Sequence, residues 1–260
     1  MKKKLYYHVY LTDDYGSWVY PFMEQYKLME DKGLLKEFSS DDVKISCISQ
    51  NDERTHVFLK LVESLGLKST IHLYANTHEN DTNMLSGINS NTTITENVTM
   101  RDIYNDSLNE DFQILYIHTK GITSVDNHLK RGNVDVFRNY YYWRQFLNWG
   151  VIERWPEACR LLERYDIVGV NYFNQPASHF SGNFWWANSS YIRTLPDPST
   201  IEWWNELQSR TLDSWLKTAP ARFRDEMWPC SNAGAKIASF KNLDNVTNLS
   251  AELIPRKHYT

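Results

Sequence analysis

Apolar residues alternate along the first third of the chain between short continuous runs and longer stretches at helical spacing. The short runs at Leu5–Leu11, Val43–Ile48 and Thr70–Tyr74 have the length and content of strands. Apolar positions recur every three or four residues over Trp18–Leu35 and Thr55–Leu65, and a glycine stands near the end of each stretch, as helices favour. This alternation predicts repeated strand-helix units and a largely parallel sheet.

The same periodicities continue after a polar tract at Asn76–Asn97, which we expect to be a loop. They predict a short helix at Asp102–Leu108 and a strand with no polar face at Phe112–Tyr116. A long helical stretch at Val134–Arg164 is expected to break at Pro156. Two further strands follow at Tyr165–Asn171 and His179–Ala187, and then a tryptophan-rich helix at Ile201–Leu216.

No change of composition marks a domain boundary, and no internal repeat is visible. The prediction is therefore an α/β protein in which one domain spans residues 1–260, with a core at about 5–231 and a polar C-terminal segment at 241–260. Its central sheet is expected to be twisted, mostly parallel and flanked by helices.

Composition excludes some classes of function. A formal charge of -4 and a pI near 6.1 give no global field that would attract nucleic acid. The three cysteines are far apart and odd in number, which favours a reducing compartment over a disulfide framework. No apolar run has the length of a membrane span, so we expect a soluble, cytoplasmic protein with no transmembrane segment.

The most informative stretch is Ile114–Gly121, where a buried strand is followed by His118, Thr119, Lys120 and a glycine. In an open α/β sheet, ligands bind outside the carboxyl ends of the strands. We therefore predict that His118 and Lys120 belong to a binding site. In the plainer alternative they are polar residues of a surface loop.

Three elements together carry a family resemblance: His118–Gly121 (H-T-K-G), Trp143-Arg144, and His179–Ala187 (H-F-S-G-N-F-W-W-A). The chain resembles a group of bacterial and viral glycosyltransferase-like proteins, and its order of strands is similar to that of nucleotide-sugar transferases with the GT-A fold. The resemblance covers about Leu5 to Ser231. It implies a GT-A-like single domain that moves a sugar from a nucleotide-diphosphate-sugar donor to a hydroxyl of a glycan or other acceptor.

One departure from the GT-A pattern concerns the metal. In such enzymes the corresponding strand ends in D-x-D, whose carboxylates hold a divalent cation against the donor diphosphate, whereas His118-Thr119-Lys120 stands in that place here. A lysine cannot ligate a cation, but its ammonium can stabilise the departing diphosphate directly. We therefore assign no metal-ligating residues. A divalent cation, Mn²⁺ or Mg²⁺, is possible as a cofactor but disfavoured.

The resemblance also implies residues for the donor. Lys120 and His118 would contact the diphosphate, and Arg138 or Arg144 would add a positive charge. In the plainer alternative, Arg144 lies on a solvated helix face or pairs with Glu153 or Glu157. The nucleoside would lie at the ends of the first two strands, against Tyr10, Leu11, Thr12 and Ser49.

On the acceptor side, the resemblance implies the residues His179, Ser181, Gly182, Asn183, Trp185 and Trp186. The glycine would let a sugar approach the backbone, and one of the two tryptophans would stack on a sugar face, since neighbours in a strand point to opposite sides. Glu226, with Asp225 second, is the expected base for an inverting reaction. Both carboxylates could instead cap a helix or form an ion pair.

Two other classes of protein remain open at this point. A lectin-like carbohydrate-binding module without catalysis would account for the 14% of aromatic residues. A metal-dependent nuclease or phosphodiesterase would need clustered carboxylates at strand ends, and these are scarce in the sequence. Inverting and retaining mechanisms are both compatible with the sequence.

Overall fold

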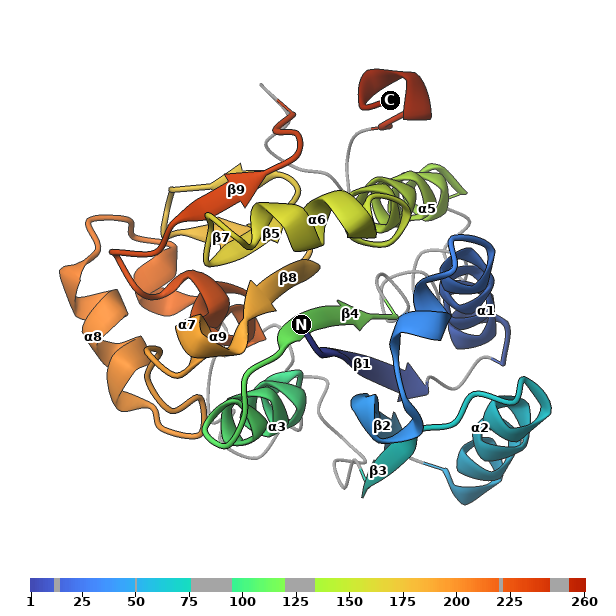
Figure 1. Ribbon diagram of the computed structural model, residues 1–260. Helices are drawn as coiled ribbons and strands as arrows, with labels where there is room; N and C mark the ends of the chain where they lie inside the picture. Colours follow the sequence, from blue (N-terminus) through green and yellow to red (C-terminus); the bar gives the residue numbers. More distant parts are fainter. Residues whose placement is uncertain (12–14, 50, 76–94, 120–133, 220–221, 244–252) are drawn as a thin grey trace.

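The protein is built around a seven-stranded sheet with the strand order β3-β2-β1-β4-β8-β5-β9. The computed structural model describes residues 1–11, 15–49, 51–75, 95–119, 134–219, 222–243 and 253–260 (Figure 1). The strands of the sheet are β1 (Lys3–Leu11), β2 (Val43–Ser49), β3 (Thr70–Ala75), β4 (Gln113–His118), β5 (Ile167–Gly169), β8 (Trp185–Asn188) and β9 (Ile237–Ser239).

The first four of these strands form a parallel half-sheet. β8 runs antiparallel to both β4 and β5, and β5 is parallel to β9. The helices are α1 (Tyr15–Asp31), α2 (Asp52–Ser64), α3 (Asn97–Ser107), α5 (Val134–Asn148), α6 (Trp155–Leu161), α7 (Ser189–Ile192), α8 (Glu202–Arg210) and α9 (Arg222–Met227). Helices pack on both faces of the sheet, so the predicted mostly parallel sheet flanked by helices is confirmed (Figure 1).

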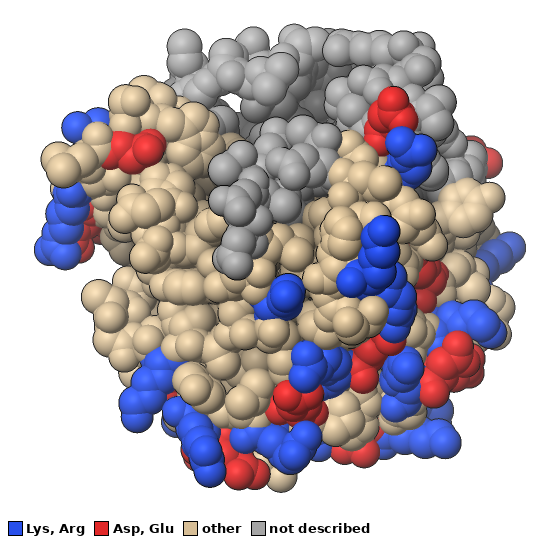
Figure 2. All heavy atoms as spheres, turned by 90° about the horizontal axis from the view of Figure 1, so that it is seen from above, with Lys and Arg blue, Asp and Glu red and all other residues tan. Residues whose placement is uncertain are grey.

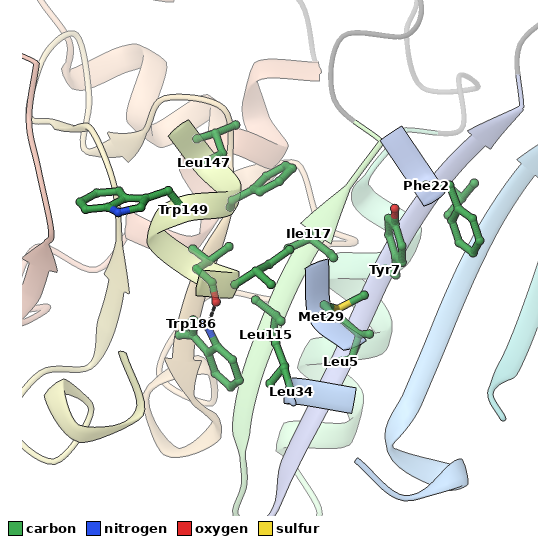
Figure 3. Close-up of a cluster of buried hydrophobic side chains, with 14 of the residues drawn as sticks. Leu5, Tyr7, Phe22, Met29, Leu34, Leu115, Ile117, Leu147, Trp149 and Trp186 are labelled. Carbon is green, nitrogen blue, oxygen red and sulfur yellow. Dashed lines mark hydrogen bonds between the residues drawn. The ribbon is translucent and has the colours of Figure 1, made fainter. Parts of the chain in front are cut away.

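Alternate residues of the central strands enter two separate hydrophobic clusters, one on each face of the sheet. Leu5, Tyr7, Leu115 and Ile117 pack against α1, α2 and α5, together with Trp186 of β8 (Figure 3). Residues of opposite parity, among them Tyr6, Ile114, Tyr116 and Trp185, pack against α3, α7, α8 and α9. The side of a strand on which a residue points therefore decides which helices it contacts.

The strands and helices of the first half lie where the sequence predicts them, but some of their ends differ by several residues, as in α3, which begins at Asn97 instead of Asp102. Asn51 caps α2 by accepting hydrogen bonds from the backbone N–H groups of Glu53 and Arg54. Gly66 follows that helix with a φ of 63°, in the left-handed region that favours glycine.

Two predicted elements are interrupted in the structure. The long helical stretch breaks before Pro156, because a π-helical turn at Trp149–Glu153 separates α5 from α6, and the proline then lies in the first turn of α6, where a missing N–H does no harm. The single strand predicted over His179–Ala187 is divided by a turn. Its first part is β7 (His179–Phe180), which pairs with β6 (Tyr172–Phe173), and its second part begins β8.

The described end of the C-terminal segment packs onto α5 and the π-helical turn, although its composition is polar. Ile254 and Tyr259 are buried in the first hydrophobic cluster, and the ring of Tyr259 lies 4.9 Å from that of Phe146 and 5.2 Å from that of Trp149. β9, which precedes this segment, was not predicted. It adds the last strand of the sheet beside β5.

Charged side chains are mixed in sign on the face of the molecule that Figure 2 shows. In the face shown in Figure 2, acidic and basic residues alternate along the lower border, and the described part of that face carries no extended area of one sign. This distribution agrees with the small net charge of -4.

A substitution at Gly150 tests how closely the π-helical turn packs against the end of β5. A Cβ atom added at Gly150 would lie 2.1 Å from Cγ1 of Val170, so we expect Gly150→Ala to destabilise the protein by about 1–3 kcal/mol through overpacking. Gly234→Ala is the matched control, because its nearest contact, Oδ1 of Asn232, is 3.4 Å away. Urea unfolding midpoints of the two variants and the parent measure the difference, and equal midpoints would contradict this packing.

Candidate functional site

A cluster of polar side chains lies where the carboxyl ends of β1 and β4 meet. The chain leaves β1 to form β2 and β3 on one side, then returns to form β4 on the other side of β1. Such a reversal of strand order opens a crevice at the carboxyl ends of the two strands, and this is where ligands bind in open α/β sheets. His8 and His118 are register partners at this point, and both are buried.

The antiparallel strand β8 brings a second sequence motif to the same place. Because Tyr116 pairs with Trp185, the turn that precedes Trp185 lies beside the end of β4. Nε2 of His118 donates a hydrogen bond to the carbonyl oxygen of Gly182 at 2.9 Å. The structure therefore brings together His118 and the Ser-Gly-Asn turn, two elements that are 64 residues apart in sequence.

The centre of the cluster is Glu96, which sequence reasoning assigned to a polar loop and missed as a site residue. Its Oε2 accepts hydrogen bonds from the Tyr116 hydroxyl at 2.6 Å and from Nδ2 of Asn183 at 2.7 Å. Its Oε1 lies 3.9 Å from Nε2 of His118, and 22% of the side chain is exposed. Glu96 immediately precedes α3, where the positive end of the helix dipole favours a carboxylate.

Asp225 lies behind Glu96 and caps the same helix. It is 3% exposed and accepts a hydrogen bond from Oγ1 of Thr95 at 2.6 Å. Burial raises the pKa of Asp225 to about 7, and the charge of Glu96 adds to this rise, while Thr95, Arg224 and the backbone N–H of Asn97 act in the opposite direction. The plainer expectation for this residue, a helix-capping carboxylate, therefore describes its contacts.

His8 and Arg224 complete the cluster. His8 hydrogen-bonds through Nδ1 with Oγ1 of Thr99 at 2.9 Å, and burial lowers its pKa to about 4, so it is neutral at pH 7. Arg224 lies with Nε 3.7 Å from Oδ1 of Asp225, and this buried Nε has no hydrogen-bond acceptor among the described residues. Arg224 thus places a positive charge beside the carboxylates.

The prediction that either Trp185 or Trp186 stacks on a sugar is wrong, because both are core residues. Trp185 and Trp186 are 0% exposed, and their rings lie in the two opposite hydrophobic clusters. Nε1 of Trp185 donates to Oδ1 of Asn183. Nε1 of Trp186 donates to the carbonyl oxygen of Val151 (Figure 3). β8 is a central strand covered on both faces, so neither ring reaches a ligand.

Gly182 and Asn183 also have roles that differ from the expected contacts with a sugar. A Cβ at Gly182 would lie 2.7 Å from Cδ1 of Leu147, so the glycine permits close packing against α5. Asn183 is fully buried in a left-handed conformation, with a φ of 57°, and its amide is engaged by Glu96 and Trp185. It therefore positions Glu96 and does not face an acceptor.

Neither predicted arginine has an uncompensated charge. Arg144 is buried and donates to both carboxylate oxygens of Glu24, at 3.1 and 3.2 Å, instead of to Glu153 or Glu157. Arg138 is exposed and pairs with Asp135 at 2.8 Å.

The remaining predicted residues lie around the same edge of the sheet or outside the described residues. The backbone N–H of Tyr10 donates to Oγ1 of Thr119 at 3.2 Å, which joins the ends of β1 and β4. Leu11 and Ser49 are register partners at the ends of β1 and β2. Both are buried, and the Ser49 hydroxyl is engaged with the backbone of Asn51. Thr12 and Lys120 lie outside the described residues.

On the acceptor side, His179 and Ser181 are partly exposed in and after β7. Nδ1 of His179 hydrogen-bonds with the carbonyl oxygen of Ala177 at 2.8 Å, and its ring stacks on Phe173. The backbone N–H of Ser181 donates to the carbonyl oxygen of Asn171 at 3.1 Å. Glu226, the expected base, is partly exposed next to Asp225.

The fold and this cluster define an α/β protein with a polar site at the point where the strand order reverses. The chain matches a family described as a domain of unknown function (DUF8361) over residues 6–233, and it belongs to that family. The match covers the cluster and ends before β9. No curated protein matches this sequence.

Two further observations are limited to the described residues. No group of three or more His, Cys, Asp or Glu side chains there is arranged to hold a metal ion. No helix in that part of the chain is long and apolar enough to cross a membrane.

The raised pKa of Asp225 predicts that the stability of the protein depends on pH. Its pKa rises from 3.8 when unfolded to about 7 when folded, so its contribution to stability is complete below pH 4 and is lost as the pH rises through 7. Asp225→Asn removes this loss. We expect the free energy of unfolding of the variant, relative to that of the parent, to rise by a few kcal/mol between pH 4 and 8, at about 1.4 kcal/mol per pKa unit.

Urea unfolding midpoints at several pH values measure this gain. The lowered pKa of His8 acts in the opposite direction, reducing stability as the pH falls from 6.5 towards 4, but both proteins share it. Asp135→Asn, at an exposed carboxylate on α5, is the control and should follow the parent. A constant difference between Asp225→Asn and the parent at all pH values would show that the pKa of Asp225 is not raised in the folded protein.

Proposed function

We propose that this protein is a glycosyltransferase of the GT-A type, which moves a sugar from a nucleotide-diphosphate-sugar donor to a hydroxyl group of a glycan or other acceptor. The observation that carries this proposal is the meeting of His118, the Ser-Gly-Asn turn and a partly exposed carboxylate at the carboxyl ends of β1 and β4. A parallel sheet that reverses its strand order favours a nucleotide at this point. A carboxylate beside it supplies an acceptor for a hydroxyl proton.

The backbone on the donor side is held firmly up to Thr119. The N–H of Thr119 donates to the carbonyl oxygen of His8 at 3.1 Å, and Nε2 of Gln25 donates to the carbonyl oxygen of His118 at 3.2 Å. Lys120 follows directly in the sequence. In the proposal, its ammonium stabilises the negative charge that develops on the diphosphate as the bond to the sugar breaks.

Arg224 replaces Arg138 and Arg144 in this proposal as the second positive charge. Both of those arginines hydrogen-bond with carboxylates, whereas Arg224 is paired only at 3.7 Å with Oδ1 of Asp225, and its Nε has no hydrogen-bond acceptor within the described part of the chain. A guanidinium is well suited to phosphate oxygens because its donors form a rigid fork. With Lys120 and Arg224 in these roles, the proposed transfer needs no divalent cation.

The lectin alternative keeps only part of the feature that favoured it, because Tyr20 and Trp215 are exposed while other aromatic side chains are buried. It depended on the abundance of aromatic residues, but Trp18, Trp185, Trp186 and Trp228 are all fully buried. Their number reflects packing of the two hydrophobic clusters and does not by itself indicate a sugar-binding surface.

A thermal-shift titration with UDP, GDP, dTDP and their sugars tests the proposal. A transferase should be stabilised by one of these nucleotides, by about 5–10 °C at roughly 100-fold excess over Kd. A lectin has no reason to respond to a free nucleoside diphosphate. Absence of any shift across the nucleotides, with and without Mn²⁺, would contradict a nucleotide site.

Lys120→Ala tests the diphosphate contact within the same titration. Loss of a charge-assisted hydrogen bond worth about 1.5–3 kcal/mol should weaken nucleotide binding by about tenfold or more. Lys60→Ala, which removes the same charge from the exposed face of α2, should bind as the parent does. If EDTA abolishes binding to the parent, the diphosphate is held by a metal ion and the role given to Lys120 is wrong.

A further inference from the structure

Glu96 differs from its neighbours in having one carboxylate oxygen held and the other open. Oε2 accepts two hydrogen bonds, from Tyr116 and Asn183, both of which donate from buried side chains. Oε1 accepts no hydrogen bond from the described residues, and Nε2 of His118, at 3.9 Å, is too distant to donate one. The carboxylate is thus fixed in orientation while one oxygen stays available to a ligand.

The two donors to Glu96 are themselves fixed by the fold. Tyr116 is fully buried in β4, with its ring 5.2 Å from that of Trp185. Asn183 adopts a left-handed backbone conformation, which residues other than glycine rarely adopt, and its Oδ1 accepts from Nε1 of Trp185. Both strands that flank the site, β4 and β8, therefore contribute to the orientation of one carboxylate.

The neighbouring carboxylate of Asp225 has the opposite character. Only 4% of its side chain is exposed, against 22% for Glu96, and its contacts are with Thr95, Asn97 and Arg224 around the start of α3. A group that exchanges a proton with a substrate has to come within hydrogen-bond reach of it. Among these two carboxylates, Glu96 is the one that a substrate can reach.

We propose that Glu96 is the catalytic base of the transfer, in place of Glu226 or Asp225, and that Tyr116 and Asn183 are its positioning residues. This inference rests on the function proposed above. The acceptor oxygen forms a bond to the anomeric carbon of the donor sugar, and the bond from that carbon to the diphosphate oxygen breaks. The electron pair of the broken bond leaves with the diphosphate, and the proton of the acceptor hydroxyl passes to Oε1 of Glu96.

The assignment implies an inverting reaction in one step, because the base and the leaving group act on opposite sides of the anomeric carbon. In this arrangement, His118 lies between the base and the leaving diphosphate. Its Nε2 donates to the carbonyl oxygen of Gly182, so the buried ring forms a wall of the site next to Glu96. Among the described residues, the other titratable or charged groups of this cluster are His8 from β1, Tyr116 from β4, and Arg224, Asp225 and Glu226 from α9.

Glu96→Gln is the direct test. The amide oxygen of glutamine can still accept from Tyr116 and Asn183, so the fold and the donor site should survive, while the proton acceptor is lost. With water as the acceptor, release of UDP, GDP or dTDP from the nucleotide-sugar that stabilises the parent should fall by about 10²–10⁴-fold. The thermal shift with the corresponding nucleoside diphosphate should be unchanged.

Glu63→Gln, at an exposed carboxylate on α2, is the control and should release nucleotide as the parent does. Glu226→Gln separates the two assignments, since the proposal expects it to retain turnover. Full turnover in Glu96→Gln, or a loss confined to Glu226→Gln, would overturn the proposal.

Tyr116→Phe is a second variant that tests the proposal if Glu96→Gln does not fold. It removes one of the two donors to Glu96, and we expect kcat to fall by about tenfold with the nucleoside diphosphate shift unchanged. A merely structural tyrosine would lower the unfolding midpoint without lowering kcat, and that result would overturn its positioning role. If the parent itself releases no nucleotide and shows no shift, the proposed function fails, which is a different outcome from failure of Glu96 alone.

Discussion

The site depends on the antiparallel pairing of β8 with β4. A parallel strand in that place would direct its preceding turn towards the amino ends of β1 and β4, whereas the antiparallel strand delivers residues 181–183 to their carboxyl ends. The hydrogen bond from His118 to the Gly182 carbonyl and the contact of Asn183 with Glu96 both follow from this direction. The parallel half-sheet thus supplies the floor of the site, and β8 supplies one wall.

A buried hydrogen-bond network on the opposite face of the sheet supports the end of β4. The Tyr7 hydroxyl donates to Gln25, whose Nε2 reaches both the His118 carbonyl and Oδ1 of Asn148. Nδ2 of Asn148 then donates to Glu24, the partner of Arg144. Each bond adds about 1 kcal/mol net, but an unsatisfied member would cost more, so the network strongly favours one position of the β4 end relative to α1 and α5.

Hydrophobic pattern was sufficient to predict the parallel half-sheet, because continuous apolar runs and helical spacing are local signals. It also led to the edge of the sheet where His118 and the Ser-Gly-Asn turn meet. Glu96 could not be found in this way. It stands at the end of a polar tract with no apolar periodicity, and its importance comes from contacts with Tyr116 and Asn183, which are 20 and 87 residues away.

The two tryptophans show the opposite kind of error. Consecutive Trp185 and Trp186 fit a stacking platform as well as a core strand, and only the helices on both faces of β8 decide between these interpretations. Arg144 was uncertain for a related reason. Its partner, Glu24, is 120 residues away on α1, whereas sequence reasoning considered only acidic residues nearby in the same helical stretch.

The central claim is that a nucleoside diphosphate binds at the carboxyl ends of β1 and β4. A crystal structure of the protein soaked with the nucleoside diphosphate that gives the largest thermal shift tests this most directly. We expect the diphosphate beside His118 and within contact of Lys120, with no cation between them and with the open oxygen of Glu96 facing the position of the sugar. Density for the nucleotide elsewhere on the protein, or a metal ion bridging it to carboxylates, would contradict the account.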